Sequence, residues 1–274
     1  MLVNAKTILD KAHKEHYAIL APNICNELTA RAAILAGVEN NTPIILDAVL
    51  SSNPNIKLLT KIVREMANNV DIPVAINLDY CSSYDNAMFA LKNGFTSVSL
   101  DCSNKPLSQG IREMAEIVET AHALNASTEG QLGIVRRVGE NVSVDDLTNV
   151  DEVKNFIEKT NIDILSISIG NSRGRYQKTP TLNFDLLKRI NAITDAPLCL
   201  HGCSYIGDDN LIKLVENGVN KVNMSTELYD YANQEVAKKI SKVNRPYEIF
   251  NIYSEAYKEI VSKYIKLLKQ NNKA

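Results

Sequence analysis

Short apolar stretches alternate with longer amphipathic stretches from one end of the chain to the other. Runs rich in aliphatic and β-branched residues predict buried strands, and apolar residues at every third or fourth position predict helices. The regular alternation is typical of repeated βα units around a parallel sheet. We predict eight strands: Tyr17–Ala21, Pro43–Asp47, Pro73–Asp79, Ser97–Asp101, Ala126–Gln131, Ile162–Ile169, Pro197–His201 and Lys221–Met224.

The stretches between these strands predict helices with one apolar face. Residues 56–70 show the pattern, with apolar side chains at Ile56, Leu59, Ile62, Val63 and Met66. Asn-Gly pairs at 93–94 and 217–218 follow apolar helical stretches, and each pair indicates the end of a helix. Residues 245–269 predict a terminal helical segment, which could pack on the rest of the protein or brace a dimer.

Eight strands alternating with helices predict an α/β fold of the (β/α)8 type, the TIM barrel. We expect a single domain over residues 1–274, with residues 245–274 as a C-terminal helical extension. An open, doubly wound dinucleotide-binding sheet is the alternative. It is disfavoured because no Gly-x-Gly-x-x-Gly fingerprint follows the first strand.

Composition narrows the range of partners. The chain has 274 residues, 45% hydrophobic and 23% charged, with a formal net charge of −2. This charge gives no overall basic field for nucleic acid or an anionic membrane, so neither partner is expected. Charged residues interrupt the first twenty positions, and a cytoplasmic protein is therefore expected. The five cysteines are an odd number without a secreted spacing, which favours reduced thiols.

Polar residues gather where the predicted strands end. In a barrel of this kind the chemistry lies at the carboxyl ends of the strands. Asp47 and Asp101 could alternatively cap the helices that follow them. Asp79 is freer for chemistry because Ser82 or Ser83 can cap the next helix. The polar positions are Asn23, Asp47, Asn77, Asp79, Asp101, Glu129, Gln131, residues 170–175, His201 and Asn223.

Two loops have the pattern of a phosphate site: residues 201–204 after the seventh strand and residues 223–226 after the eighth. Free backbone N–H groups and the helix dipole favour an anion at such positions. Gly170 and Gly174 after the sixth strand could let the backbone approach the same anion. The alternative is that Ser204 and Ser225 are ordinary helix caps.

Six segments in the same order resemble the class II fructose/tagatose-bisphosphate aldolases. Residues 73–83 (PVAINLDYCSS) resemble the PVALHLDHGSS segment of that family, and residues 94–98 (GFTSV) followed by Asp101 resemble GFTSVMID. The other four are EGQLG at 129–133 for EAELG, IGNSRGRY at 169–176 for AIGTxHGxY, LHGCS at 200–204 for LHGGS, and KVNMST at 221–226 for KVNxxT. The resemblance covers nearly the whole chain.

The resemblance implies zinc-dependent cleavage of a ketose bisphosphate into dihydroxyacetone phosphate and an aldehyde, in a homodimer or larger oligomer. The three histidines that hold zinc in the family fall on Tyr80, Arg173 and His201, so one histidine remains. A catalytic zinc ion ordinarily has three protein ligands, and a guanidinium offers no lone pair. We therefore expect a degenerate metal site and no cofactor.

Other family elements are retained. The catalytic aspartate of the family matches Asp79. One conserved glutamate matches Glu129, and Gln131 takes the place of the second. Cys203 and Tyr205 replace small glycines in the loop after strand seven. The phosphate-binding elements match Gly174, Ser204, Asn223, Ser225 and Thr226.

Three functions stay open at this stage. The first is a metal-independent carbon-carbon lyase or isomerase with Asp79 as acid/base, Arg173 stabilising an enediolate oxygen and Tyr80 beside them. Tyr80 could equally be a hydrogen-bonding core residue. The sugar phosphate would be bound by Asn23, Gly174, Arg175, His201, Gly202, Ser204, Asn223, Ser225 and Thr226.

The second is a catalytically inactive sugar-phosphate-binding protein or partner subunit. The third is a zinc-dependent fructose/tagatose-bisphosphate aldolase with substitute ligands, because Cys25, Cys81, Cys102 and Cys203 lie near predicted strand ends. Buried apolar thiols are the alternative for these cysteines.

Four further basic residues are expected to have no role. A Schiff-base mechanism would need a lysine at an inner strand end. Lys221 is the only strand lysine in view, and it opens the eighth strand, toward the bottom of the barrel. His13, His16 and His122 fall in predicted helices or at their edges.

Overall fold

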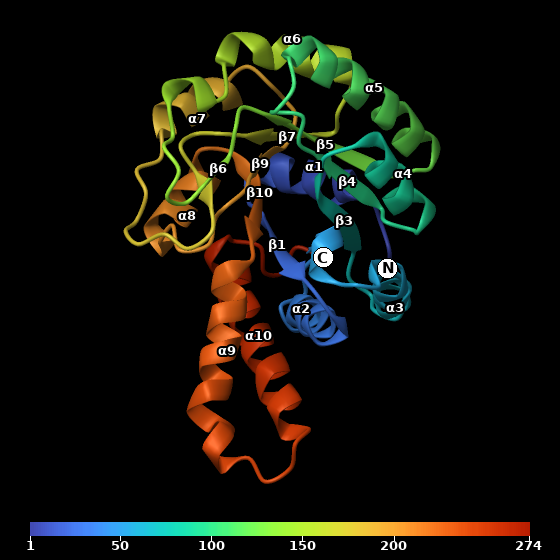
Figure 1. Ribbon diagram of the computed structural model, residues 1–274, viewed down its shortest axis with the longest axis vertical. Helices are drawn as coiled ribbons and strands as arrows, with labels where there is room; N and C mark the ends of the chain where they lie inside the picture. The colour runs from blue at the N-terminus through green and yellow to red at the C-terminus, as the bar shows by residue number, and fades with distance from the viewer.

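Eight parallel strands close into a barrel in the order β1, β10, β9, β7, β5, β4, β3, β2 (Figure 1). The structure is a computed structural model that describes all residues 1–274. Sequence patterning thus predicted the closed barrel correctly, and the open dinucleotide-binding sheet is wrong. The strands are β1 Ile19–Ile24, β2 Ile44–Ala48, β3 Val74–Cys81, β4 Ser97–Leu100, β5 Ser127–Leu132, β7 Ile164–Ile167, β9 Leu198–Leu200 and β10 Val219–Met224.

Helices surround the barrel, and one of them closes its N-terminal end. Apolar residues of the first helix pack against inward-facing strand residues, including Ile19, Ile45 and Ala75, in a separate buried cluster of 11 residues. This helix therefore plugs the N-terminal end of the barrel and leaves the other end for ligands. The helices are α1 Ala5–Glu15, α2 Glu27–Glu39, α3 Ile56–Asn68, α4 Tyr84–Lys92, α5 Leu107–Ala123, α6 Val150–Thr160, α7 Phe184–Asn191, α8 Asp208–Glu216, α9 Thr226–Lys239 and α10 Glu248–Leu267.

The helix boundaries follow local side-chain chemistry. The side chain of Ser83 accepts a hydrogen bond from Asn86 N and caps α4, as expected from the sequence. The Asn-Gly pairs also end helices as predicted, because Gly94 and Gly218 have φ of 89° and 97°. Most other helices begin at an asparagine whose side chain accepts from the first turn.

Two short strands were not predicted. Strand β6 (Arg136–Arg137) pairs in parallel with β8 (Ser172–Arg173), outside the main barrel. A two-residue strand has no measurable hydrophobic period, so the sequence pattern could not reveal it. This small sheet joins the long connection after β5 to the loop after β7.

The predicted C-terminal helical segment is α10, which runs antiparallel to α9 in an arm that projects from the barrel (Figure 1). It packs on α9 and α2. The hydroxyls of Tyr257 and Tyr229 both donate to the backbone carbonyl of Asn23 at the end of β1. The arm therefore supports the strand end that carries Asn23. No helix here combines the length and apolar character needed to cross a bilayer.

This support is testable with Tyr257→Phe, which removes one buried hydrogen bond and leaves the Asn23 carbonyl bonded to Tyr229. We expect the free energy of unfolding, measured with urea, to fall by about 1 kcal/mol. Tyr84→Phe is the matched control, because Tyr84 is 44% exposed, and a change below about 0.5 kcal/mol is expected for it. Equal effects of the two substitutions would contradict the supporting role of the arm.

Candidate active site

The carboxyl ends of the strands form a cavity of about 300 Å³. Ten of the residues predicted for the site line it: Asn23, Asp79, Tyr80, Arg173, Gly174, Gly202, Ser204, Asn223, Ser225 and Thr226. Val49, Arg137 and Met224 complete the lining. His201 is buried behind this surface, beside Asp79, and Arg175 lies outside the lining.

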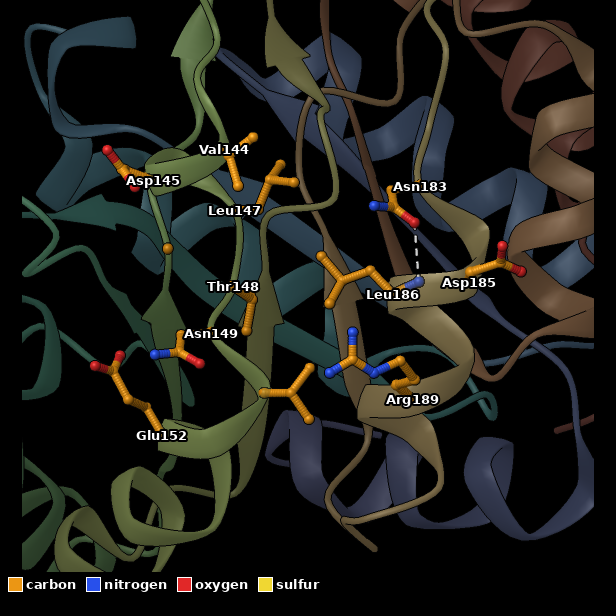
Figure 2. A pocket seen from close by; sticks show the side chains of 12 residues that line it. Val144, Asp145, Leu147, Thr148, Asn149, Glu152, Asn183, Asp185, Leu186 and Arg189 are labelled. Atoms are coloured by element: carbon orange, nitrogen blue, oxygen red, sulfur yellow. Dashed lines mark hydrogen bonds between the residues drawn. The ribbon is translucent and has the colours of Figure 1, made fainter.

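A larger hollow of about 750 Å³ lies between the segment leading into α6 and the start of α7 (Figure 2). Asn183 accepts from Leu186 N there and caps α7. Asp145, Glu152 and Asp185 outnumber the single cation, Arg189, so this hollow does not favour an anionic ligand. It shares no residue with the cavity around Asp79.

Glu129 is the centre of a buried ion network. Its Oε1 accepts from Ser99 Oγ at 2.6 Å and lies 2.6 Å from His201 Nε2, and its Oε2 accepts from Lys221 Nζ at 2.7 Å. Burial alone would raise the pKa of Glu129, but the positive charges of Lys221 and His201 hold it below its usual range. The carboxylate is therefore ionised and fixes the orientation of the His201 ring.

Lys221 corrects an expectation from the sequence. It is the third residue of β10, not the first, and its fully buried ammonium lies inside the barrel, 3.6 Å from Asp47 Oδ1. Asp47 does not cap a helix either, since it accepts from Asn77 Nδ2 at 2.8 Å and Asn55 caps α3. Burial raises the pKa of Asp47 to about 7, although Lys221 opposes the shift.

Asp79 faces the cavity beside His201. Its Oδ1 lies 3.5 Å from His201 Nδ1, and its Oδ2 lies 3.5 Å from Asn23 Nδ2. The Oδ1 atom is buried without a hydrogen-bond partner. Burial raises the pKa of Asp79, with His201 acting in the opposite direction. A buried carboxylate with an unsatisfied oxygen has the proton affinity required of a general base.

Arg173 reaches across the barrel mouth from the loop after β7. Its guanidinium carbon lies 3.9 Å from the ring centroid of Tyr80, and its Nη2 donates to Asp101 Oδ2 at 2.9 Å. Its Nε is buried without a partner. Burial raises the pKa of Tyr80 well above its usual value, so the phenol stays protonated. The cation is thus held between an aromatic face and a carboxylate.

Asp101 was expected either to cap a helix or to serve the site, and the cap is wrong. Helix α5 starts after Pro106 with no side-chain cap. Both Ser103 groups, N–H and hydroxyl, donate to Asp101 Oδ1, and Gln131 Nε2 lies 3.2 Å from it. Burial would raise the pKa of Asp101, but the hydrogen bonds from Ser103 and Arg173 lower it. Asp101 therefore stays ionised and positions Arg173.

The loops after β9 and β10 meet at the N-terminus of α9. Ser204 does not cap its own helix α8, whose N-cap is Gly207; its hydroxyl accepts from Ser225 N at 3.1 Å and Glu227 N at 3.3 Å. Ser225 occupies the N-cap position of α9 but makes no side-chain cap bond. Ser204 therefore already satisfies two N–H groups at the start of α9, and the positive end of the helix dipole, beside the lining residues Ser225 and Thr226, is what favours an anion here.

Gly202 is required by close packing. It has φ of 70°, and a Cβ at this position would lie 2.2 Å from Ser172 O. The contact brings the loop after β9 against β8. Arg175, also predicted to bind substrate, instead pairs with Asp230 and lies over the Tyr205 ring, 5.5 Å from its centroid.

The residues at the zinc-ligand positions do not fit a catalytic zinc ion. The resemblance puts Tyr80 and Arg173 at two of these positions, and the guanidinium is a permanent cation without a lone pair. Ligand atoms of Glu129, Cys199 and His201 lie within 4.8 Å of one another. The Glu129 oxygens are already engaged, however, and burial raises the pKa of Cys199 well above its usual value.

Sequence reasoning missed two cations. Arg137 lines the cavity, and Lys221 joins the buried carboxylates. The available signals were a lysine within the predicted eighth strand and the basic pair Arg136–Arg137, which begins three residues after the EGQLG segment. The four cysteines considered as substitute ligands are free thiols, and the cysteine closest to the buried histidine and glutamate is Cys199 instead. His13 contacts Asn220 and His122 contacts Asp163, both away from the cavity.

The closed barrel, with charged side chains at the carboxyl ends of its strands, has the architecture of a (β/α)8-barrel enzyme. Residues 3–273 match the family described as Fructose-bisphosphate aldolase class-II, and the chain belongs to that family.

The chain is similar in sequence to fructose-bisphosphate aldolases. That of Helicobacter pylori (strain J99) is 31% identical over 306 aligned positions, which cover 100% of both chains. That of Thermus caldophilus is 32% identical, covering 97% of this chain and 98% of the relative. Among solved structures, the YdjI aldolase from Escherichia coli K12 superposes with a TM-score of 0.89 at 27% identity, over 99% of this chain and 98% of that one.

The stability of the ion network depends on Lys221. Lys221→Met leaves Glu129 and Asp47 buried without their cation, and we expect the free energy of unfolding to fall by about 3–5 kcal/mol. Urea unfolding measures the loss, with Lys213→Met on the exposed face of α8 as control. A loss as small as that of the control would contradict the network.

The pH dependence of stability provides a second test. The folded state raises the pKa of Asp47 to about 7, so the folded protein binds a proton that the unfolded chain releases near pH 4. This contribution to stability is present in acid and is lost as the pH rises toward 7, at up to about 1.4 kcal/mol per pH unit. Asp47→Asn should make the decline between pH 5 and pH 7 shallower in urea unfolding. An unchanged slope would contradict the assignment.

Proposed function

We propose that the protein is a metal-independent aldolase-type lyase that cleaves a carbon-carbon bond of a phosphorylated sugar. One observation carries the proposal. The guanidinium of Arg173, which the resemblance puts at a zinc-ligand position of the family, is stacked on Tyr80 and held by Asp101, and it lines the same cavity as Asp79, whose Oδ1 has no partner. A fixed cation and a base thus share one cavity.

Asp79 is the acid/base group. Its free Oδ1 removes the proton from the substrate hydroxyl next to the scissile bond. The hydroxyl oxygen becomes the carbonyl oxygen of the aldehyde as the carbon-carbon bond breaks. The electron pair of that bond passes to the ketone oxygen of the other fragment, which becomes an enediolate. Asp79 keeps the proton until the enediolate carbon takes it back.

Arg173 stabilises the enediolate oxygen. Its Nε is buried and unpaired, so an N–H donor remains for the developing negative charge. The phenol ring of Tyr80 stacks on the guanidinium and, being neutral, brings no negative charge that would pair with it. Both groups are in place before substrate enters, which means that no reorganisation is needed during the reaction.

The phosphate is bound at the loops after β7, β9 and β10. Gly174, Gly202, Ser204, Ser225 and Thr226 line this part of the cavity. The N-terminus of α9 adds its dipole. Asn23 and Asn223, at the ends of neighbouring strands, are placed to bind sugar hydroxyls. We also propose that the protein works as a homodimer, as the resemblance implies.

An inactive sugar-phosphate-binding protein is the second candidate. It is favoured by the Asp101–Arg173 pair, because a carboxylate that neutralises the guanidinium also weakens it as an electrostatic catalyst. The two candidates differ in what Asp79 does. A binder shows no turnover even with Asp79 in place, and its affinity for the sugar phosphate is unchanged in Asp79→Asn.

Turnover of the purified, chelator-treated protein on a panel of ketose phosphates tests the proposal. We expect activity to persist without metal and to fall by about 100-fold or more in Asp79→Asn, because general base catalysis is lost. Arg173→Gln should cost a similar factor. Asp71→Asn, on the exposed surface, is the control with the same change of charge.

Three outcomes would overturn the proposal. Binding of a ketose phosphate without any turnover would identify an inactive binder. Turnover unchanged in Asp79→Asn would remove the assigned base. Stoichiometric zinc in the purified protein, with activity lost on chelation, would establish a zinc-dependent aldolase with substitute ligands.

A further inference from the structure

Arg137 is a cavity residue that the proposed reaction does not use. It lies on β6, in the long connection between β5 and α6, and lines the cavity together with Arg173. Strands β6 and β8 pair in parallel with Arg137 opposite Arg173. The small sheet outside the barrel therefore brings two arginines, from two different loops, to one edge of the cavity.

Only one of the two arginines is paired with a carboxylate. Arg173 is paired with Asp101, whereas the side chain of Arg137 forms no ion pair in the structure. The neighbouring Arg136 points elsewhere and donates twice to Asp146. Asp79 is the only carboxylate in the cavity lining, and it lies against His201. Glu140 Oε2 accepts from the backbone N–H of Arg137 at 2.8 Å but forms no ion pair with its guanidinium, so the Arg137 side chain remains free to bind a ligand at this edge.

Arg137 lies at the end of the proposed phosphate site that is opposite α9. That site comprises the loops after β7, β9 and β10, with α9 following β10, and Arg137 pairs with Arg173 beside the loop after β7. Arg137 follows β5, so it comes from the far side of β7. A small ligand with its phosphate at α9 presents its other end toward the β5 side of the cavity.

We propose that Arg137 binds a carboxylate at the end of the ligand remote from the phosphate, so that the substrate is a phosphorylated sugar acid. The guanidinium fork matches a planar carboxylate in a bidentate pair. A carboxylate carries one negative charge, which one free arginine balances, whereas a second phosphate would bring about −1.5 to −2. This inference rests on the phosphate site of the proposed function and names the substrate class for it.

Two matched ligands test the assignment. 6-Phosphogluconate and glucitol 6-phosphate both have six carbons and a phosphate on carbon 6. At carbon 1, 6-phosphogluconate has a carboxylate and glucitol 6-phosphate has a hydroxymethyl group. By calorimetry, the unmodified protein should bind 6-phosphogluconate about tenfold more tightly. Arg137→Gln should abolish this preference and leave the affinity for glucitol 6-phosphate within about twofold. Arg112→Gln, on the exposed face of α5, is the control for the loss of one positive charge.

Each contrary result has its own meaning. A preference that survives Arg137→Gln, or the lack of any preference in the unmodified protein, overturns the role of Arg137. Tighter binding of fructose 1,6-bisphosphate than of 6-phosphogluconate, lost in Arg137→Gln, overturns the carboxylate in favour of a second phosphate. If neither 6-carbon probe binds, the phosphate site of the proposed function fails as well. If the unmodified protein prefers 6-phosphogluconate and loses that preference in Arg137→Gln but turns over no substrate, this inference stands and only the catalytic proposal is contradicted.

Discussion

The buried carboxylate of Glu129, held by Lys221 and His201, is the interaction on which the rest of the site depends. Three carboxylates lie in the barrel interior, and burying them without cations would cost several kcal/mol each. Lys221 reaches two of them, Asp47 and Glu129, and His201 reaches Glu129 and Asp79. The network fixes the imidazole, and its Nδ1 lies 3.5 Å from the oxygen of Asp79 that has no hydrogen-bond partner.

Most of the barrel can be predicted from the sequence, because buried hydrophobic residues recur with the period of a strand or of a helix. All eight strands appear within a few residues of their predicted bounds, and the serine cap of α4 and the two Asn-Gly helix ends lie where local chemistry places them. The candidate site was also largely readable, since ten predicted residues line one cavity. Strand ends in a parallel barrel converge, so polar residues at those ends must meet.

What the sequence could not reveal depends on tertiary geometry. Asp47 and Asp101 have the local pattern of helix caps, but contacts from Asn77 and from Arg173 draw them to other partners. Lys221 was placed at the start of a strand because it follows the Asn-Gly helix end closely and no local signal shows that its carboxylate partners, Asp47 and Glu129, lie on other strands. The pairing of β6 with β8 joins residues 36 positions apart, Arg137 and Arg173, and no local signal announces a contact over that distance.

The side chains around Arg173 are matched to its positive charge. Gln131, at a position where the resemblance places a glutamate, donates its amide N–H to Asp101 Oδ1 and to the carbonyl of Gly133. A second carboxylate there would repel Asp101, and the repulsion would compete with the pair that holds Arg173. Tyr80 offers a flat aromatic face on which the guanidinium stacks. Side chains from the ends of β3, β4 and β5 thus converge on one guanidinium. Their aromatic contact, ion pair and supporting hydrogen bond together offset the cost of holding a partly buried cation at the barrel mouth.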